Sequence, residues 1–120
     1  MASSDFLTTA ERTELDKTIR AAERACRAEI SVFLGDVDGD PRDFATSLHN
    51  TLFTPTRSVL IMVDPSRRCV EVVTGGYVRR TLTDDEVARA VTEMTSAFAA
   101  GDLAGGLSRG VQALGEYAKD

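Results

Sequence analysis

The residues with the clearest potential for chemistry lie in one short acidic segment. Asp36, Asp38 and Asp40 place three carboxylates at the first, third and fifth positions of a calcium loop of the EF-hand type. The remainder of that pattern is missing, because Pro41 occupies the position of the loop glycine and Ser47 that of the bidentate glutamate. The segment therefore offers oxygen ligands for a hard cation without a complete calcium-binding loop.

A further aspartate, Asp64, follows a run of apolar residues. In an open α/β sheet, ligands bind beyond the carboxyl ends of parallel strands, where we expect both Asp36 and Asp64. The sequence thus predicts a calcium or magnesium site formed by Asp36, Asp38 and Asp64. The alternative is purely structural: Asp40 caps a helix, and the other two loop aspartates serve a solvated turn.

These aspartates depend on a strand that we predict at the centre of a sheet. The run from Val59 to Val63 is apolar without alternation, which a strand tolerates only when both of its faces are covered. We therefore predict a central strand at residues 58–63. A proline-containing turn at 64–68 and a second apolar segment at 69–73 complete an antiparallel hairpin.

The segments before this hairpin predict a βαβ unit. Thr8 and Glu11 form a capping box, so a helix should run over about 9–27, followed by a strand at 29–34. A second helix should begin directly after the acidic segment and end at the proline-containing residues 53–56. Because a strand, a helix and a strand follow one another, the two strands should be parallel, with a right-handed crossover.

The segments after the hairpin predict two more helices. A capping box that begins at Thr83 starts the first, Gly101 ends it, and Asp102 caps the second. Residues 77–82 could add a fourth short strand. The whole pattern predicts an α/β fold, with a small mixed sheet of three or four strands and helices on both faces, in a single domain over residues 1–120.

The composition argues against several classes of protein. A formal net charge of -5 argues against nucleic-acid binding, which needs a clustered basic surface, and the longest apolar run is too short for a membrane span. The first residues have neither the basic nor the apolar region of a secretory signal, so we expect the chain as given to be cytoplasmic. Cys26 and Cys69 are too few for a disulfide framework and lack metal-ligand spacing.

Catalytic motifs are absent from the sequence. His49 is the only histidine, and neither a nucleophile motif nor a phosphate-binding glycine loop accompanies it. The acidic residues still allow a hydrolase, in which Asp36 and Asp64 hold a cation while Arg67 or Arg68 stabilises developing charge on a phosphate. Aspartate chemistry of this kind normally needs a lysine nearby, and the sequence places neither of the two lysines at this site.

Three segments of the second half resemble the TPM domain family. They are 72–77, 82–84 and 101–107. Their order and spacing, together with the hairpin before them, are similar to the family's pattern over nearly the whole chain, and closest to a small bacterial branch of unknown function. Tyr77 stands where the family has a second glycine, Leu103 replaces an aromatic residue, and the family's tryptophan is missing.

The resemblance implies a three-layer α/β/α fold and, in some relatives, divalent-cation binding or acid phosphatase activity. Family members are usually exported or membrane-anchored. Because catalytic motifs are absent, we expect a non-enzymatic accessory or interaction domain, and a cation-dependent acid phosphatase-like hydrolase is the alternative. Glu71 lies among apolar residues of the last strand, which suits a partly exposed sheet edge that pairs with an unknown protein partner or forms a homodimer.

Overall fold

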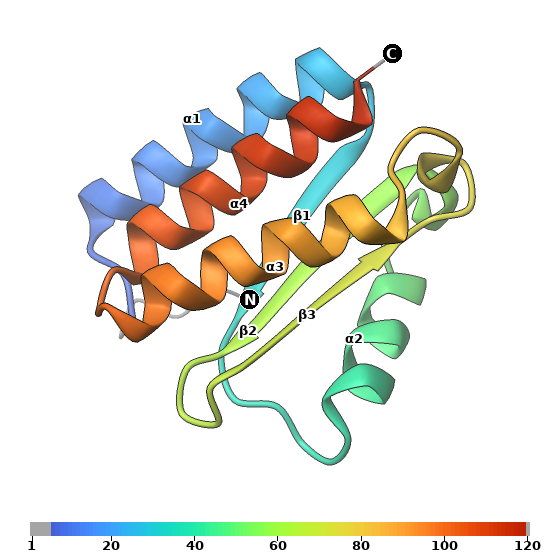
Figure 1. Ribbon diagram of the computed structural model, residues 1–120. Helices are drawn as coiled ribbons and strands as arrows, with labels where there is room; N and C mark the ends of the chain where they lie inside the picture. Colours follow the sequence, from blue (N-terminus) through green and yellow to red (C-terminus); the bar gives the residue numbers. More distant parts are fainter. Residues whose placement is uncertain (1–5, 120) are drawn as a thin grey trace.

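The fold consists of a three-stranded sheet and four α-helices (Figure 1). The computed structural model describes residues 6–119. Two short 3₁₀ helices, η1 and η2, precede β2 and α3 respectively. In chain order the elements are α1 (Thr9–Cys26), β1 (Glu29–Leu34), α2 (Pro41–Asn50), η1 (Pro55–Arg57), β2 (Ser58–Asp64), β3 (Cys69–Thr74), η2 (Val78–Arg80), α3 (Asp84–Ala99) and α4 (Leu103–Ala118).

The predicted central strand is confirmed, because the strand order is β1-β2-β3. β1 and β2 are parallel, with Glu29 opposite Ser58 at the start of the pairing. β2 and β3 are antiparallel, with Asp64 opposite Cys69 next to the hairpin turn. The βαβ unit and the hairpin therefore both form as the sequence predicts.

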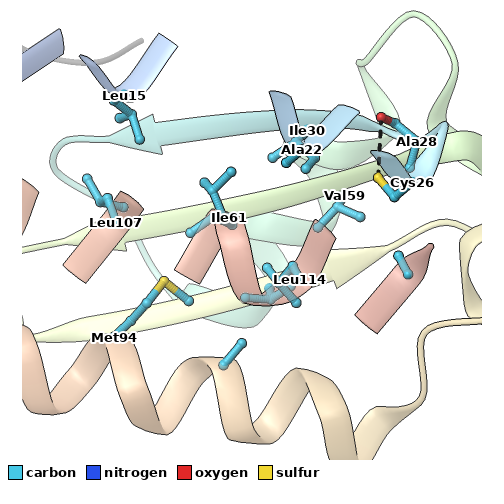
Figure 2. Close-up of a cluster of buried hydrophobic side chains, with 14 of the residues drawn as sticks. Leu15, Ala22, Cys26, Ala28, Ile30, Val59, Ile61, Met94, Leu107 and Leu114 are labelled. Atoms are coloured by element: carbon cyan, nitrogen blue, oxygen red, sulfur yellow. Dashed lines mark hydrogen bonds between the residues drawn. The ribbon is translucent and has the colours of Figure 1, made fainter. Parts of the chain in front are cut away.

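Helices cover both faces of the sheet, which makes three layers (Figure 1). On one face, β2 packs Val59 and Ile61 against α1, α3 and α4 (Figure 2). On the other face, Leu60 and Met62 meet α2. All seven residues of β2 are buried, which explains why its apolar residues do not alternate with polar ones.

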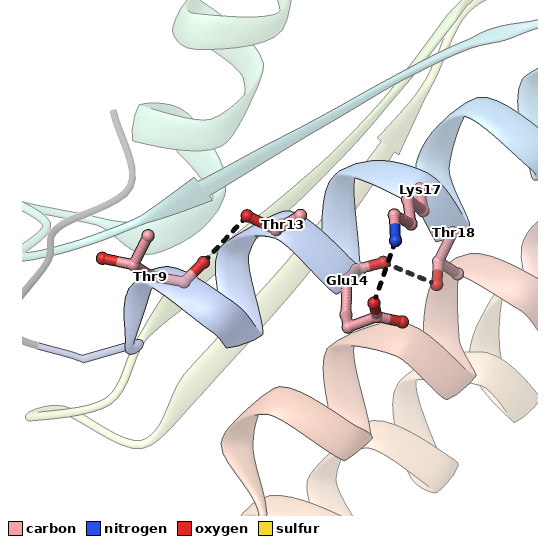
Figure 3. Close-up of polar contacts among 5 residues, drawn as sticks. All are labelled: Thr9, Thr13, Glu14, Lys17 and Thr18. Carbon is pink, nitrogen blue, oxygen red and sulfur yellow. Dashed lines mark hydrogen bonds and ion pairs between the residues drawn. The ribbon is translucent and has the colours of Figure 1, made fainter.

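The first helix shows how local signals set its limits. Thr8 accepts a hydrogen bond from the Glu11 N–H and its own N–H donates to the Glu11 carboxylate, so the predicted capping box is present. The outward face is polar, with an exposed Lys17–Glu14 ion pair at 3.4 Å (Figure 3). Arg27 ends the helix in the left-handed conformation, with φ of 59°.

The first and last helices approach each other closely. They run side by side over the same face of the sheet (Figure 1). A Cβ added at Gly115 of α4 would lie 2.8 Å from the Ala22 Cβ and 3.2 Å from the Ala22 Cα of α1. Only a residue without a side chain fits there, so this glycine sets the spacing of the two helices.

The possible fourth strand at 77–82 is wrong. The Tyr77 N–H donates to the Thr56 carbonyl at 2.9 Å, and after it the chain turns into η2. The Leu82 N–H then donates to the Val78 carbonyl at 2.9 Å. Turn hydrogen bonds have taken the place of strand pairing, and they return the chain to the start of α3.

None of the helices within residues 6–119 combines the length and the apolar character that crossing a bilayer requires.

Candidate functional site

Asp64 ends β2, at the position that the sequence predicts, and its carboxylate is almost fully buried. The residue is 1% exposed. One oxygen, Oδ2, accepts a hydrogen bond from the Val37 N–H at 2.9 Å, and Oδ1 accepts one from the Arg67 N–H at 3.2 Å. The carboxylate thus joins the loop after β1 to the turn after β2 through backbone donors.

Arg67 makes the reciprocal connection. Its guanidinium donates to the carbonyls of Val37 at 3.1 Å and Gly39 at 2.9 Å. A positive charge of the protein therefore binds two backbone carbonyls of the acidic loop. Sequence reasoning placed Arg67 in this turn but missed this role, because its partners lie 28 and 30 residues away.

The aspartates of the acidic loop divide into two roles. Asp36 and Asp38 are exposed. Asp40 caps α2, since its Oδ2 accepts a hydrogen bond from the Asp43 N–H at 3.0 Å. The helix-cap part of the structural alternative is therefore confirmed.

The three predicted metal ligands do not gather in one cluster. Within residues 6–119, no three His, Cys, Asp or Glu side chains lie close enough together to hold a metal ion. Asp64 faces backbone donors of the loop instead of the carboxylates of Asp36 and Asp38. A calcium or magnesium site at Asp36, Asp38 and Asp64 stays a prediction that needs the loop to rearrange.

A cavity of about 360 Å³ lies beside the hairpin turn. Its walls are mostly apolar and include Val63 and Phe98, and its polar members are Asp64, Arg68, Cys69 and Thr95. Burial, and after it the negative charge of Asp64, raises the pKa of the Cys69 thiol. Cys69 therefore holds its proton at neutral pH and is a weak nucleophile.

The only histidine lies at the other end of β2. His49 is buried, and its Nε2 lies 2.9 Å from the Ser58 carbonyl. Ser58 begins β2, whereas Asp64 ends it. The imidazole thus joins α2 to the sheet and stands apart from every carboxylate considered above.

β3 is an edge strand, as expected, but arginine side chains bind two of its outward carbonyls. The Gly75 N–H donates to the Ser58 carbonyl at 2.9 Å, so by alternation the backbone groups of Val72 and Thr74 point away from β2. The Val72 carbonyl accepts a hydrogen bond from Arg42 at 2.8 Å, and the Thr74 carbonyl accepts one from Arg79. Two arginines therefore cover the edge that the sequence offered for pairing.

The outer side of β1 is more open. The Gly35 N–H donates to the Val63 carbonyl at 3.1 Å, so the backbone of Ile30 and Val32 points away from β2. The Glu23 carboxylate of α1 accepts a hydrogen bond from the Ile30 N–H at 2.9 Å. No described strand pairs with the outer side of β1. A cavity of about 240 Å³ lies between α1 and this edge, and its lining includes Arg12, Leu15, Asp16, Ile19, Val32 and Leu34.

Comparison with known sequences identifies relatives without an established role. Residues 2–115 match the model of a family described as "Domain of unknown function (DUF5130)". The uncharacterized protein Rv2468c of Mycobacterium tuberculosis strain H37Rv is 30% identical over 105 residues. The match covers 88% of this chain and 63% of that protein, so the chain spans less than two thirds of this relative.

Solved structures share the fold. The BA42 protein of Bizionia argentinensis has a TM-score of 0.85 at 24% identity, over 94% of this chain and 81% of its own. The N-terminal domain of a P. gingivalis protein has a TM-score of 0.81 at 22% identity, over 97% and 78% of the two chains. The N-terminal domain of the cg2496 protein of Corynebacterium glutamicum has a TM-score of 0.80 at 18% identity, over 98% of this chain and 78% of its own. The small α/β fold is therefore shared.

Proposed function

The chain belongs to the DUF5130 family, and we propose that it is a non-enzymatic interaction domain that binds an extended segment of a partner protein along the outer edge of β1. The motif resemblance in residues 72–107 supports the further proposal that this family is related to TPM domains.

The observation that carries this proposal is the outward backbone of Val32. Its N–H and C=O point away from β2, and the neighbouring Ile30 N–H is bound only by a glutamate side chain. Strand addition supplies main-chain hydrogen bonds to such groups, and pockets beside the edge select alternate side chains. Leu15 and Ile19 line the adjacent cavity, so we expect apolar residues at alternate positions of the partner segment.

The two sheet edges differ in a way that makes the test sharp. Val32→Pro removes an outward N–H from β1, and Val70→Pro removes the equivalent group from the guarded edge of β3. Proline is tolerated at such outward positions of edge strands. Peptides selected for binding from a displayed library should lose binding with Val32→Pro and keep it with Val70→Pro, both variants being checked for native amide spectra.

A second variant addresses the cavity without changing the backbone. Ile19→Glu places a charge beside β1 and should also abolish peptide binding. Peptide binding that survives both Val32→Pro and Ile19→Glu would refute the proposal. Sedimentation that shows a dimer broken by Val32→Pro would identify a second copy of the chain as the occupant.

We also propose weak binding of calcium or magnesium by the acidic loop, with a Kd on the order of 0.1 to 1 mM because the bidentate glutamate is missing. The exposed carboxylates of Asp36 and Asp38 support it, and the hydrogen bonds of Arg67 oppose it. Amide shifts during a calcium titration should centre on 35–40 and 64–68. Asp36→Asn should weaken binding, whereas Asp40→Asn should not, since asparagine caps a helix almost as well.

The phosphatase alternative has less support at this site. Arg67 is engaged by the loop carbonyls, which leaves the exposed Arg68 as the arginine able to stabilise charge on a phosphate. Turnover of an aryl phosphate with calcium, magnesium or manganese, abolished by Arg68→Gln, would favour the enzyme. Turnover no higher than the uncatalysed background, at all pH values from acid to neutral, would eliminate the phosphatase alternative.

A further inference from the structure

A second polar cluster lies at the other end of the sheet, far from the acidic loop. It consists of Arg27, Arg57, Tyr77 and Arg80, which we call the arginine cluster. The guanidinium carbons of Arg57 and Arg80 lie 4.1 Å and 5.0 Å from the centroid of the Tyr77 ring. Arg57 directly precedes β2, whereas Asp64 ends it, so the length of the central strand separates this cluster from the acidic loop.

Backbone contacts hold the cluster in place. Arg27 ends α1, while Arg57 and Arg80 belong to the two 3₁₀ helices. The Tyr77 N–H donates to the Thr56 carbonyl at 2.9 Å, which fixes the ring beside η1. Three separate parts of the chain thus contribute arginines to one end of the sheet.

A small cavity lies within the cluster. It measures about 170 Å³, and its lining includes Arg27, Arg80, Tyr77 and Thr81. None of the described lining residues carries a carboxylate. Arg27 and Arg80 are exposed, and Tyr77 is 44% exposed. The opening is therefore reached from solvent, and the charged residues that line it within residues 6–119 are both arginines.

The arginines of the cluster have no acidic partner in the described structure. Within residues 6–119, none of the ion pairs uses an arginine of the cluster; their basic members are Lys17, Arg42, Arg109 and Lys119. A chain of net charge -5 has a surplus of carboxylates, yet none of those within residues 6–119 forms an ion pair here. Arg57 and Arg80 share the Tyr77 ring, and Arg27 lines the cavity together with Arg80. Positive charges gathered in this way repel one another, and a bound anion would lower that cost.

We propose that the arginine cluster binds a phosphate monoester group. Guanidinium groups bind phosphate oxygens through paired hydrogen bonds, with a geometry that a lysine ammonium cannot reproduce. The cavity accommodates the phosphate while the rest of the ligand lies outside. That ligand is either a small soluble phosphate ester or a lipid headgroup. Phe53, which is 95% exposed and precedes Arg57 by four residues in the chain, offers a side chain that would contact a lipid surface.

Titration with inorganic phosphate, followed by amide and arginine Nε shifts, tests the site directly. Up to about 20 mM phosphate should shift Arg27, Arg57 and residues 77–81, as expected for a site of millimolar affinity. Arg27→Gln and Arg80→Gln should each weaken phosphate binding at least about fivefold. Arg80→Lys should weaken it less, because lysine keeps the positive charge although it lacks the paired N–H donors of a guanidinium. Arg20→Gln, at an exposed position of α1 outside the cavity lining, changes net charge equally and should leave binding unchanged.

Vesicles distinguish the two sources of the phosphate. Phosphatidylcholine vesicles that contain phosphatidic acid should capture the protein if the ligand is a lipid, and Phe53→Ser should then reduce capture. Phosphate shifts without capture would identify a soluble ester. Absence of both shifts and capture would overturn the proposal. So would equal weakening by Arg20→Gln and Arg80→Gln, or equal capture by phosphatidylglycerol, which carries no monoester.

Discussion

Replacing Asp64 by alanine should cost a large part of the stability of this protein. The substitution removes two hydrogen bonds from backbone donors to a carboxylate, each worth about 1.5 to 3 kcal/mol net. Val37 is only 5% exposed, so its N–H would have little access to replacement water. Allowing for relaxation and partial hydration at Arg67, we expect a loss of about 3 to 5 kcal/mol of unfolding free energy.

Graded substitutions separate the hydrogen bonds from the charge. Asp64→Asn keeps one acceptor oxygen and should lose about half as much, roughly 1.5 to 2.5 kcal/mol. Asp36→Asn removes the same charge from an exposed position and should change stability by about 0.5 kcal/mol or less. Urea unfolding followed by circular dichroism measures all three.

The same experiment distinguishes the backbone role of Asp64 from a metal-binding role. If the hydrogen bonds to Val37 and Arg67 account for the loss, the effect of Asp64→Ala is the same with a chelator as with calcium. A loss below about 1 kcal/mol, or one that appears only when calcium is present, would refute the reasoning.

Three further predictions concern residues in the sheet or next to it. Cys69 should be alkylated by iodoacetamide at pH 8 more slowly than a free cysteine, because its raised pKa leaves less thiolate, and Asp64→Asn should speed the reaction measured by mass spectrometry. Gly75→Ala should destabilise the fold by about 2 kcal/mol or more, since the new Cβ would lie 2.1 Å from a backbone carbonyl oxygen of η1, whereas Gly76→Ala, with its nearest atom at 3.8 Å, should be nearly neutral in thermal unfolding. His49→Ala should cost about 2 kcal/mol in urea unfolding, because it empties a buried site and removes one of the two hydrogen bonds at the Ser58 carbonyl, which also accepts the Gly75 N–H.

Features encoded by neighbouring residues were predictable from the sequence. The capping boxes at Thr8 and Thr83 and the cap at Asp40 each depend on a partner three residues away, and all three are present. The apolar run of β2 predicted its central position because only a strand covered on both faces can be apolar throughout. The parallel pairing with β1 then followed from the helix between them.

Contacts between distant segments were not predictable in the same way. Arg67 holds the acidic loop, and Arg42 and Arg79 cover the edge of β3, through carbonyls that any residue carries. No side-chain pattern marks such acceptors. The error at 77–82 has a related cause, because the decisive hydrogen bond joins Tyr77 to a carbonyl of η1.

The close packing of α1 against α4 has a consequence for synthesis on the ribosome. Leu15 and Ala22 of α1 are buried in the core that α4 completes with Leu107 and Leu114, and Gly115 sets the spacing of the two helices. A nascent chain whose α4 is still inside the exit tunnel therefore exposes the apolar stripe of α1, although that helix emerged first. We expect the fold to close only after α4 leaves the tunnel, and chaperones to engage α1 during that interval.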